Sequence, residues 1–198
     1  MNIEKKINTA KITYAGMFTA LVAVFQYLGG FIKLGGNFSI SLVLLPIVIG
    51  SALCGVAVGG WLGFVFAVMV FVTGDAAFFL SISVIGTIIT VVLKGIAAGL
   101  AAGFVYKLTE KINRYLAVFL AAIVSPIVNT GVFLIGCRLF FFDAVNEWAI
   151  GEGMPVGTYM IVALVGLNFV FELVFNIVLA PVALRLINIG KKTISSSK

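Results

Sequence analysis

Residues 87–106 read TIITVVLKGIAAGLAAGFVY, and residues 159–184 read YMIVALVGLNFVFELVFNIVLAPVAL. Both stretches are long and apolar enough to cross a bilayer, yet the first contains Lys94 and the second contains Glu172. A charge at the centre of a membrane helix costs about 2.5–3.5 kcal/mol on insertion scales, so such residues usually pair, face a water-filled cavity or hold a ligand. The two stretches predict an integral membrane protein with a polar interior.

The composition supports the same class. Hydrophobic residues make up 62% of the chain and charged residues 10%, and the mean hydropathy is +1.24. A soluble domain has about a quarter of its residues charged. The chain has no histidine, and its two cysteines show no metal-ligand spacing, so we predict no metal, no cofactor and no catalytic site. We expect one all-α membrane domain over residues 1–198.

Six segments meet or approach the length of about 20 mainly apolar residues that a spanning helix needs. Ten of the thirteen Lys and Arg residues lie at the two termini and in the loop near residues 107–114, whereas four of the seven acids lie in the alternate loops. The positive-inside rule then places both termini in the cytoplasm and explains the basic charge without nucleic acid. We predict a compact bundle of six transmembrane helices at about residues 12–28, 40–56, 57–72, 84–106, 116–142 and 158–187.

The connections differ on the two sides. The second and third helices follow each other almost directly, which predicts a tight Gly-rich hairpin at residues 51–60. Residues 29–39 and 143–157 form longer outer loops, which either close over a ligand or act as solvated connectors. In the fourth helix, the spacing Gly95-x3-Gly99-x3-Gly103 predicts close packing against another helix inside the bundle.

Polar residues also follow a helical spacing. Asn168, Glu172 and Asn176 occupy positions i, i+4 and i+8, so they share a face that must point inward. Lys94 and Asn129 lie at comparable depth in their own helices, which predicts a cluster of these five residues. The cluster is either a buried ion pair supported by amides or the floor of a solute pocket. Four residues near the outer face are further candidates for the pocket: Lys33, Asn37, Asp75 and Arg138. Asn129 and Arg138 are nine residues apart, about half a turn around a helix, so they cannot both face one pocket.

The first helix carries small residues on adjacent rows, and these form a flat surface suited to a partner helix or to internal packing. The residues of this small-residue surface are Ala15, Gly16, Thr19, Ala20 and Ala23.

With these features, the whole chain resembles the substrate-binding S component of energy-coupling factor (ECF) vitamin transporters. The likeness covers the length, the six helices, the basic termini and the small-residue surface. It also covers the positions Gly50, Cys54–Gly55, Gly59–Gly60, Gly63 and Lys94–Gly95. The family often has Gly-Pro at the turn between the second and third helices, where this chain has Gly55–Val56.

The resemblance implies a non-enzymatic component in the plasma membrane of a prokaryote. It would capture a water-soluble vitamin from outside and dock through the first helix onto a transmembrane coupling protein driven by two cytoplasmic ATPases. The chain itself has no G-x4-G-K-[ST] motif for ATP. Lys33, Lys94 and Arg138 would suit pantothenate or folate, while aromatic residues would equally suit riboflavin. The alternatives are a stand-alone transporter or channel acting as a homo-oligomer, a membrane enzyme, or a purely structural membrane protein.

Overall fold

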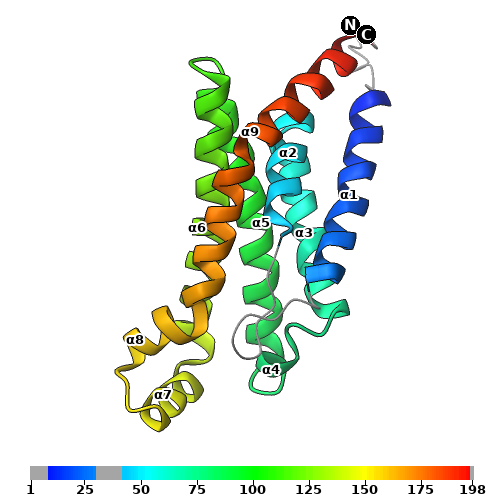
Figure 1. Cartoon of the computed structure of the whole chain (residues 1–198). Helices are drawn as coiled ribbons and strands as arrows, with labels where there is room; N and C mark the ends of the chain where they lie inside the picture. The colour runs from blue at the N-terminus through cyan, green and yellow to red at the C-terminus, as the bar shows by residue number, and fades with distance from the viewer. Residues whose placement is uncertain (1–8, 30–41, 197–198) are drawn as a thin grey trace, which may run out of the picture.

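The computed structural model describes residues 9–29 and 42–196, and within these ranges the chain is helical with no strand. The all-α prediction is therefore confirmed for the described chain. Figure 1 shows the elements in order: α1 Thr9–Gly29, α2 Leu44–Cys54, α3 Val56–Val72, α4 Ala77–Leu80, α5 Val84–Thr109, α6 Arg114–Phe140, α7 Phe142–Gly151, α8 Val156–Tyr159, the π-helix η1 Met160–Val165, and α9 Gly166–Ser196.

The two ends of the bundle have different compositions. The start of α1, the end of α9 and the turn between α5 and α6 lie together at one end (Figure 1). Lys107, Arg114 and Lys191 are at this end, which we call the basic end. The short helices α4, α7 and α8 lie at the opposite end, where the chain carries Asp75 and Glu147. The predicted separation of basic and acidic loops is thus present in the fold.

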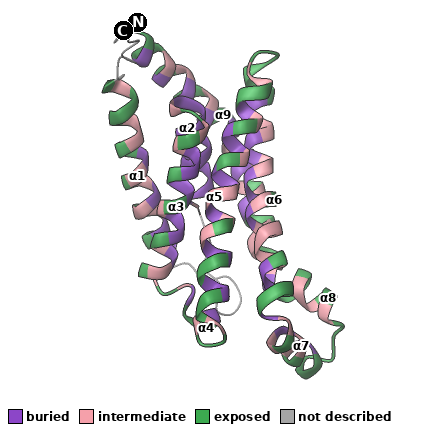
Figure 2. Cartoon of the chain, turned by 180° about the vertical axis from the view of Figure 1, so that it is seen from behind, coloured by how far each residue is buried: buried purple, intermediate pink, exposed green. Residues whose placement is uncertain are grey.

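Four helical stretches are long and apolar enough to span a membrane: Thr9–Gly29, Val84–Thr109, Arg114–Phe140 and Val156–Ser196. Two shorter apolar helices, Leu44–Cys54 and Val56–Val72, lie within or at the second and third predicted segments. Large apolar side chains cover the outside of the bundle, including Ile85, Leu139 and Leu167, each about 70% exposed. Figure 2 shows such exposed positions along the outward faces of the helices, as expected for a surface that lipid covers.

Glycine allows α3 and α5 to touch backbone to backbone. A Cβ added to Gly63 would collide with the carbonyl oxygen of Gly95, and a Cβ added to Gly95 would collide with that of Gly63. Gly59 and Gly99 have the same reciprocal relationship one turn away. The predicted internal packing role of the α5 glycines is confirmed, and α5 lies between α3 and α6 as the central helix.

Local sequence determines where several helices begin. The Ser83 hydroxyl accepts a hydrogen bond from the Gly86 amide at 3.2 Å and caps α5. Asn113 caps α6 in the same way, because its side-chain oxygen accepts bonds from the amides of Tyr115 and Leu116. Gly55 alone separates α2 from α3, with a φ of 110° that favours glycine. The predicted tight turn is therefore a single residue.

Some predicted boundaries are wrong. Residues 143–157 are not one loop, because Phe142–Gly151 forms α7 and buries Val145 and Ala149 on one face. Val145 packs with Phe79, Cys137 and Phe141, and the i, i+4 spacing places Ala149 on the same face of α7. The last helix continues to Ser196 rather than ending at residue 187, because buried Ile194 extends its apolar face. The predicted outer loop at residues 29–39 lies almost wholly outside the described residues.

Candidate functional site

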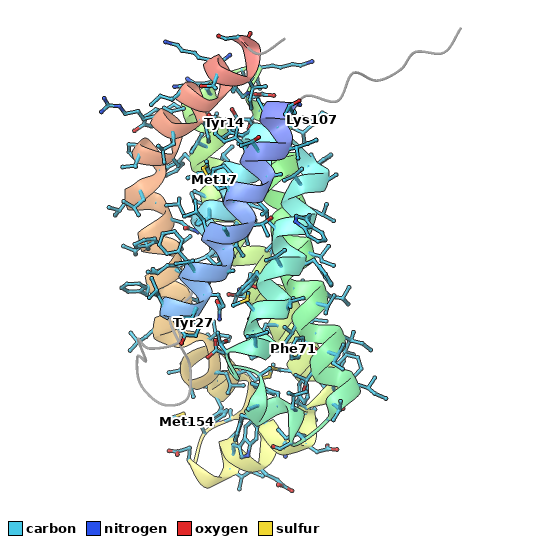
Figure 3. All side chains as sticks on the ribbon, turned by 90° about the vertical axis from the view of Figure 1, so that its right-hand side faces the viewer. Tyr14, Met17, Tyr27, Phe71, Lys107 and Met154 are labelled. Atoms are coloured by element: carbon cyan, nitrogen blue, oxygen red, sulfur yellow. The ribbon has the colours of Figure 1, made fainter. Side chains whose placement is uncertain are left out.

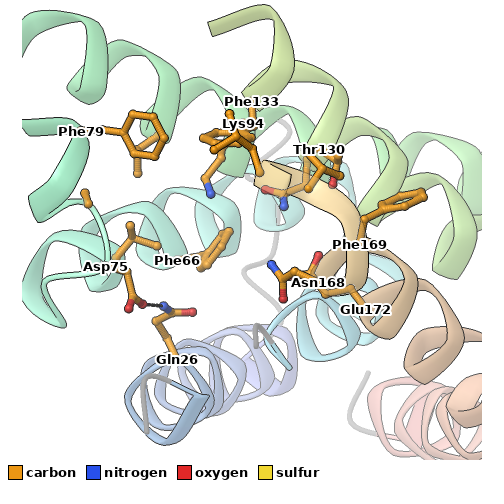
Figure 4. A pocket seen from close by; sticks show the side chains of 16 residues that line it. Gln26, Phe66, Asp75, Phe79, Lys94, Thr130, Phe133, Asn168, Phe169 and Glu172 are labelled. Carbon is orange, nitrogen blue, oxygen red and sulfur yellow. Dashed lines mark hydrogen bonds between the residues drawn. The ribbon is translucent and has the colours of Figure 1, made fainter. Parts of the chain in front are cut away.

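A pocket lies in the half of the bundle away from the basic end, between α1, α3, α5, α6 and the start of α9. Its empty volume is about 780 Å³, including the part that is open to solvent. Polar and aromatic side chains from all of these helices face it (Figure 4). Among the described residues the polar members are Gln26, Asp75, Lys94, Asn129, Thr130, Asn168 and Glu172, and the aromatic members are Phe66, Phe79, Phe133 and Phe169.

Lys94 projects from α5 into this pocket. Its ammonium nitrogen lies 5.5 Å from the centroid of the Phe66 ring and 5.5 Å from that of Phe133, within the range of cation–π attraction. The carboxylates of Glu172 and Asp75 also attract it electrostatically. Aromatic faces and acidic groups together compensate for a charge that α5 carries into an apolar bundle.

Glu172 and Asn168 reach the pocket from α9. They are four residues apart, so the helix presents both on one face. Glu172 is only 3% exposed, and Figure 4 shows it on the side of the pocket opposite Lys94. The segment that leads into this face contains the π-helix η1, whose Leu164 and Val165 also line the pocket. Single π turns inside helices occur frequently at functional sites.

A hydrogen-bonded pair closes another side of the pocket. The Gln26 amide nitrogen donates to Oδ2 of Asp75 at 2.6 Å, and the Thr73 hydroxyl lies 3.0 Å from the same oxygen. Asp75 follows α3, so the pair joins α1 to the turn between α3 and α4. Gln26 is 3% exposed, although it belongs to an otherwise apolar stretch of α1.

Three amide oxygens at the pocket have no hydrogen-bond partner within the described chain: Oε1 of Gln26, Oδ1 of Asn129 and Oδ1 of Asn168. Leaving a buried acceptor unbonded costs about 1–3 kcal/mol, and proteins rarely accept this several times at one place. Because all three residues line the same pocket, a ligand that donates to them would satisfy these groups.

The structure brings together five of the nine residues predicted as substrate-binding: Asp75, Lys94, Asn129, Asn168 and Glu172 line the pocket. Asn176 is buried one turn farther along α9, and its amide nitrogen donates to the carbonyl oxygen of Ala122 at 3.3 Å. Arg138 is exposed on α6, with its guanidinium 4.0 Å from the centroid of the Phe142 ring. The predicted incompatibility of Asn129 and Arg138 is confirmed. Lys33 and Asn37 lie outside the described residues.

Sequence reasoning missed Gln26, which is the polar residue that α1 contributes. The signal was available, because a lone amide inside an apolar helix calls for the same explanation as Lys94 does. Thr130, Phe66, Phe133 and Phe169 were also missed. With 18 phenylalanines in the chain, no pattern distinguished those that line the pocket.

The small-residue surface of α1 lies on the outside of the bundle. Gly16 and Ala20 are exposed, and no described atom beyond its own stretch of helix lies within 4 Å of a Cβ built on Gly16. Thr19 is half-buried, and its hydroxyl accepts a hydrogen bond from the Trp61 indole nitrogen at 3.1 Å. Figure 3 shows α1 at the surface, with Tyr14 and Met17 toward the basic end and Tyr27 toward the pocket end. The described part of the chain leaves Gly16 and Ala20 uncovered, whereas Ala15, Thr19 and Ala23 are half-buried.

Comparison with known proteins gives one result that covers most of the chain. A family model described as "ECF transporter, substrate-specific component" matches residues 10–187. No curated protein and no solved structure gives a significant match. The matched range includes α1, the pocket and most of α9.

Proposed function

The chain belongs to the family of substrate-specific components of ECF transporters, and we propose that it captures a water-soluble vitamin or related micronutrient for ATP-driven uptake. It is a multi-pass membrane protein, and its family is a class of transporter components rather than of enzymes. The unbonded amide oxygens of Gln26, Asn129 and Asn168 carry this proposal. A purely structural polar cluster would satisfy its own hydrogen bonds, whereas a binding pocket keeps acceptors for its ligand.

The proposed orientation places the basic end in the cytoplasm and the pocket in the outer half of the membrane. The support is the charge distribution, because cytoplasmic segments carry an excess of Lys and Arg. In this orientation α2 and α3 complete six membrane segments beside the four long helical stretches. The membrane would be the plasma membrane of a prokaryote.

In the pocket, we assign solute binding to the polar residues Gln26, Asp75, Lys94, Asn129, Asn168 and Glu172. The phenyl rings of Phe79 and Phe169, which Figure 4 shows at the pocket, offer flat apolar contact. A few convergent polar groups on an apolar lining are typical of small-molecule sites. Lys94 and Glu172 are then both solute contacts and mutual electrostatic partners.

We assign partner docking to the small-residue surface of α1, with Gly16 and Ala20 at its centre. Small side chains allow the backbone of a partner helix to approach closely in a membrane. The proposed partners are a transmembrane coupling protein and two cytoplasmic ATPases, which would supply the energy for uptake. The exposure of Gly16 and Ala20 supports the assignment, since internal packing leaves both residues uncovered.

Uptake and binding assays test the proposal. Mass spectrometry of the solute retained by the purified chain identifies the probe, and uptake of that compound is measured in cells with and without the coupling protein and ATPases. We expect binding by the chain alone and uptake only with the complete complex. Uptake that persists without the ATPases would instead favour a stand-alone transporter, and a purified chain that binds no small molecule would refute the proposal.

A further inference from the structure

We infer that the pocket selects a flat solute that is neutral or positively charged and donates N–H hydrogen bonds, and that it rejects carboxylates. The inference rests on the proposed function, because it names the chemistry of the solute for the same pocket. It differs from one of the two sequence-based expectations, namely that Lys33, Lys94 and Arg138 would suit a carboxylate-bearing vitamin; Lys33 lies outside the described residues. Arg138 is exposed on the surface beside Phe142 and does not belong to the pocket lining.

The charges of the lining residues give the first argument. Among the described residues that line the pocket, Asp75 and Glu172 are acidic and Lys94 is basic, so the formal sum is one negative charge. Lys94 is already attracted by both carboxylates and lies over two phenyl rings. Among these described groups, a ligand carboxylate would meet two carboxylates and one ammonium group that is already engaged, in surroundings of low polarity that disfavour a further anion. A cation would be favoured there.

The orientation of Gln26 gives the second argument. Asp75 can only accept a hydrogen bond as a carboxylate, so Gln26 must turn its NH₂ group toward it. The Gln26 oxygen is thereby left as an acceptor, and Figure 4 shows it directed toward the pocket. Gln26 is 97% buried, so water at the protein surface does not satisfy this oxygen.

Asn129 and Asn168 extend the same pattern on two other helices. Each has a buried side-chain oxygen without a partner among the described residues. Three residues with such an oxygen, on α1, α6 and α9, therefore line one space. A carboxylate has no N–H to donate to them, whereas an amide, an amidine or an amino-substituted heterocycle has. The rings of Phe66, Phe79 and Phe133 favour a flat skeleton for the donor.

Four small probes of nearly equal shape separate the effect of ligand charge from that of hydrogen bonding. Benzamidine is a cation with N–H groups, and benzamide is neutral with N–H groups. Acetophenone is neutral and has no N–H group, and benzoate is an anion. Binding to the purified full chain in detergent is measured by ligand-observed NMR titration, with empty micelles subtracted. We expect benzamidine to bind at least about tenfold more tightly than benzoate, and benzamide at least about threefold more tightly than acetophenone.

Variants connect these preferences to the pocket. Glu172→Gln should reduce the benzamidine-to-benzoate preference at least about fivefold, and Asn168→Asp should increase it. The matched control is Glu147→Gln, which removes the same charge from an exposed position on α7 and should leave the preference within about twofold. If Glu172→Gln does not fold, as judged by gel filtration, Asn168→Asp still tests the sign of the effect.

Two results would overturn the inference: benzoate binding as tightly as benzamidine, or none of the four probes binding to the wild-type chain. The proposed function fails separately. If uptake does not depend on the ATPases while the cation preference holds, the transporter assignment is wrong and the chemistry of the pocket stands. If uptake depends on the ATPases but benzoate binds best, only this inference falls.

Discussion

Gln26 Nε2 donates a hydrogen bond of 2.6 Å to Oδ2 of Asp75, and this bond connects the pocket end of α1 to the turn after α3. The same helix exposes Gly16 and Ala20 two to three turns away. One helix therefore contacts both the pocket and the surface that we assign to partner docking. A solute that orders Gln26 and a partner that binds α1 act on the same rigid element, and any effect of one on the affinity of the other must be reciprocal.

Replacing Gln26 tests its place in the pocket. In Gln26→Leu, Asp75 loses its amide donor and the pocket loses one acceptor, so affinity for the retained solute should fall about tenfold or more. Titration of the solute onto the purified protein measures the change. The control Thr13→Val alters an exposed hydroxyl on the same helix and should leave affinity unchanged. If Gln26→Leu and the wild type bind the solute with equal affinity, Gln26 does not belong to the binding site.

The glycine contact between α3 and α5 predicts a loss of stability. Gly63→Ala or Gly95→Ala places a methyl group against a backbone carbonyl, and overpacking of this kind costs about 1–3 kcal/mol. Thermal unfolding in detergent should therefore begin at a lower temperature. Gly16→Ala adds the same methyl group where no described atom beyond its own stretch of helix lies within 4 Å, so its midpoint should equal or exceed that of the wild type. Similar midpoints for all three variants would contradict the backbone contact.

The small-residue surface predicts a defect in uptake without a defect in binding. Gly16→Leu or Ala20→Leu should abolish uptake, because a large side chain separates α1 from the coupling protein. Solute binding in detergent should remain, since neither residue lines the pocket. Ala163→Leu enlarges an exposed alanine on η1 and serves as the control, with uptake preserved. Loss of binding in a folded α1 variant would show that this surface supports the pocket instead.

The interaction of Lys94 with Glu172 is testable by a double-mutant cycle. Lys94→Met and Glu172→Gln should each destabilise the protein, and the double variant should recover part of the loss. We expect a coupling free energy of about 0.5–3 kcal/mol from unfolding measurements on all four proteins. Additive effects would show that the two charges do not stabilise each other.

A second double-mutant cycle, on an ion pair outside the pocket, provides the comparison for Lys94 and Glu172. Lys191 and Glu110 form an ion pair at the basic end, and their side chains are 27% and 29% exposed. Solvent reaches this pair, so its coupling should be at most about 1 kcal/mol. Glu110→Gln should also leave solute affinity unchanged, because neither residue touches the pocket.

Much of the fold followed from local patterns in the sequence. Apolar length predicted the long helices, the grouping of Lys and Arg predicted which turns lie together, and the spacing of Gly95 and Gly99 predicted a close helix contact. The end of α9 and the existence of α7 were not predicted, since both depend on burial against residues distant in the sequence. Val145 becomes a core position only because Phe79 and Cys137 lie next to it.

For this protein, the sequence alone determined that polar groups would have to face inward, because hydrocarbon tolerates neither Lys94 nor Glu172. Which of those groups share one pocket was decided by tertiary structure. A helix fixes the direction of each side chain relative to its own axis, but the rotation and crossing of the helices decide where those directions meet. In this arrangement Gln26 donates a hydrogen bond to Asp75, and Asn176 donates one to the backbone of Ala122. Arg138 lies on the outside, beside Phe142.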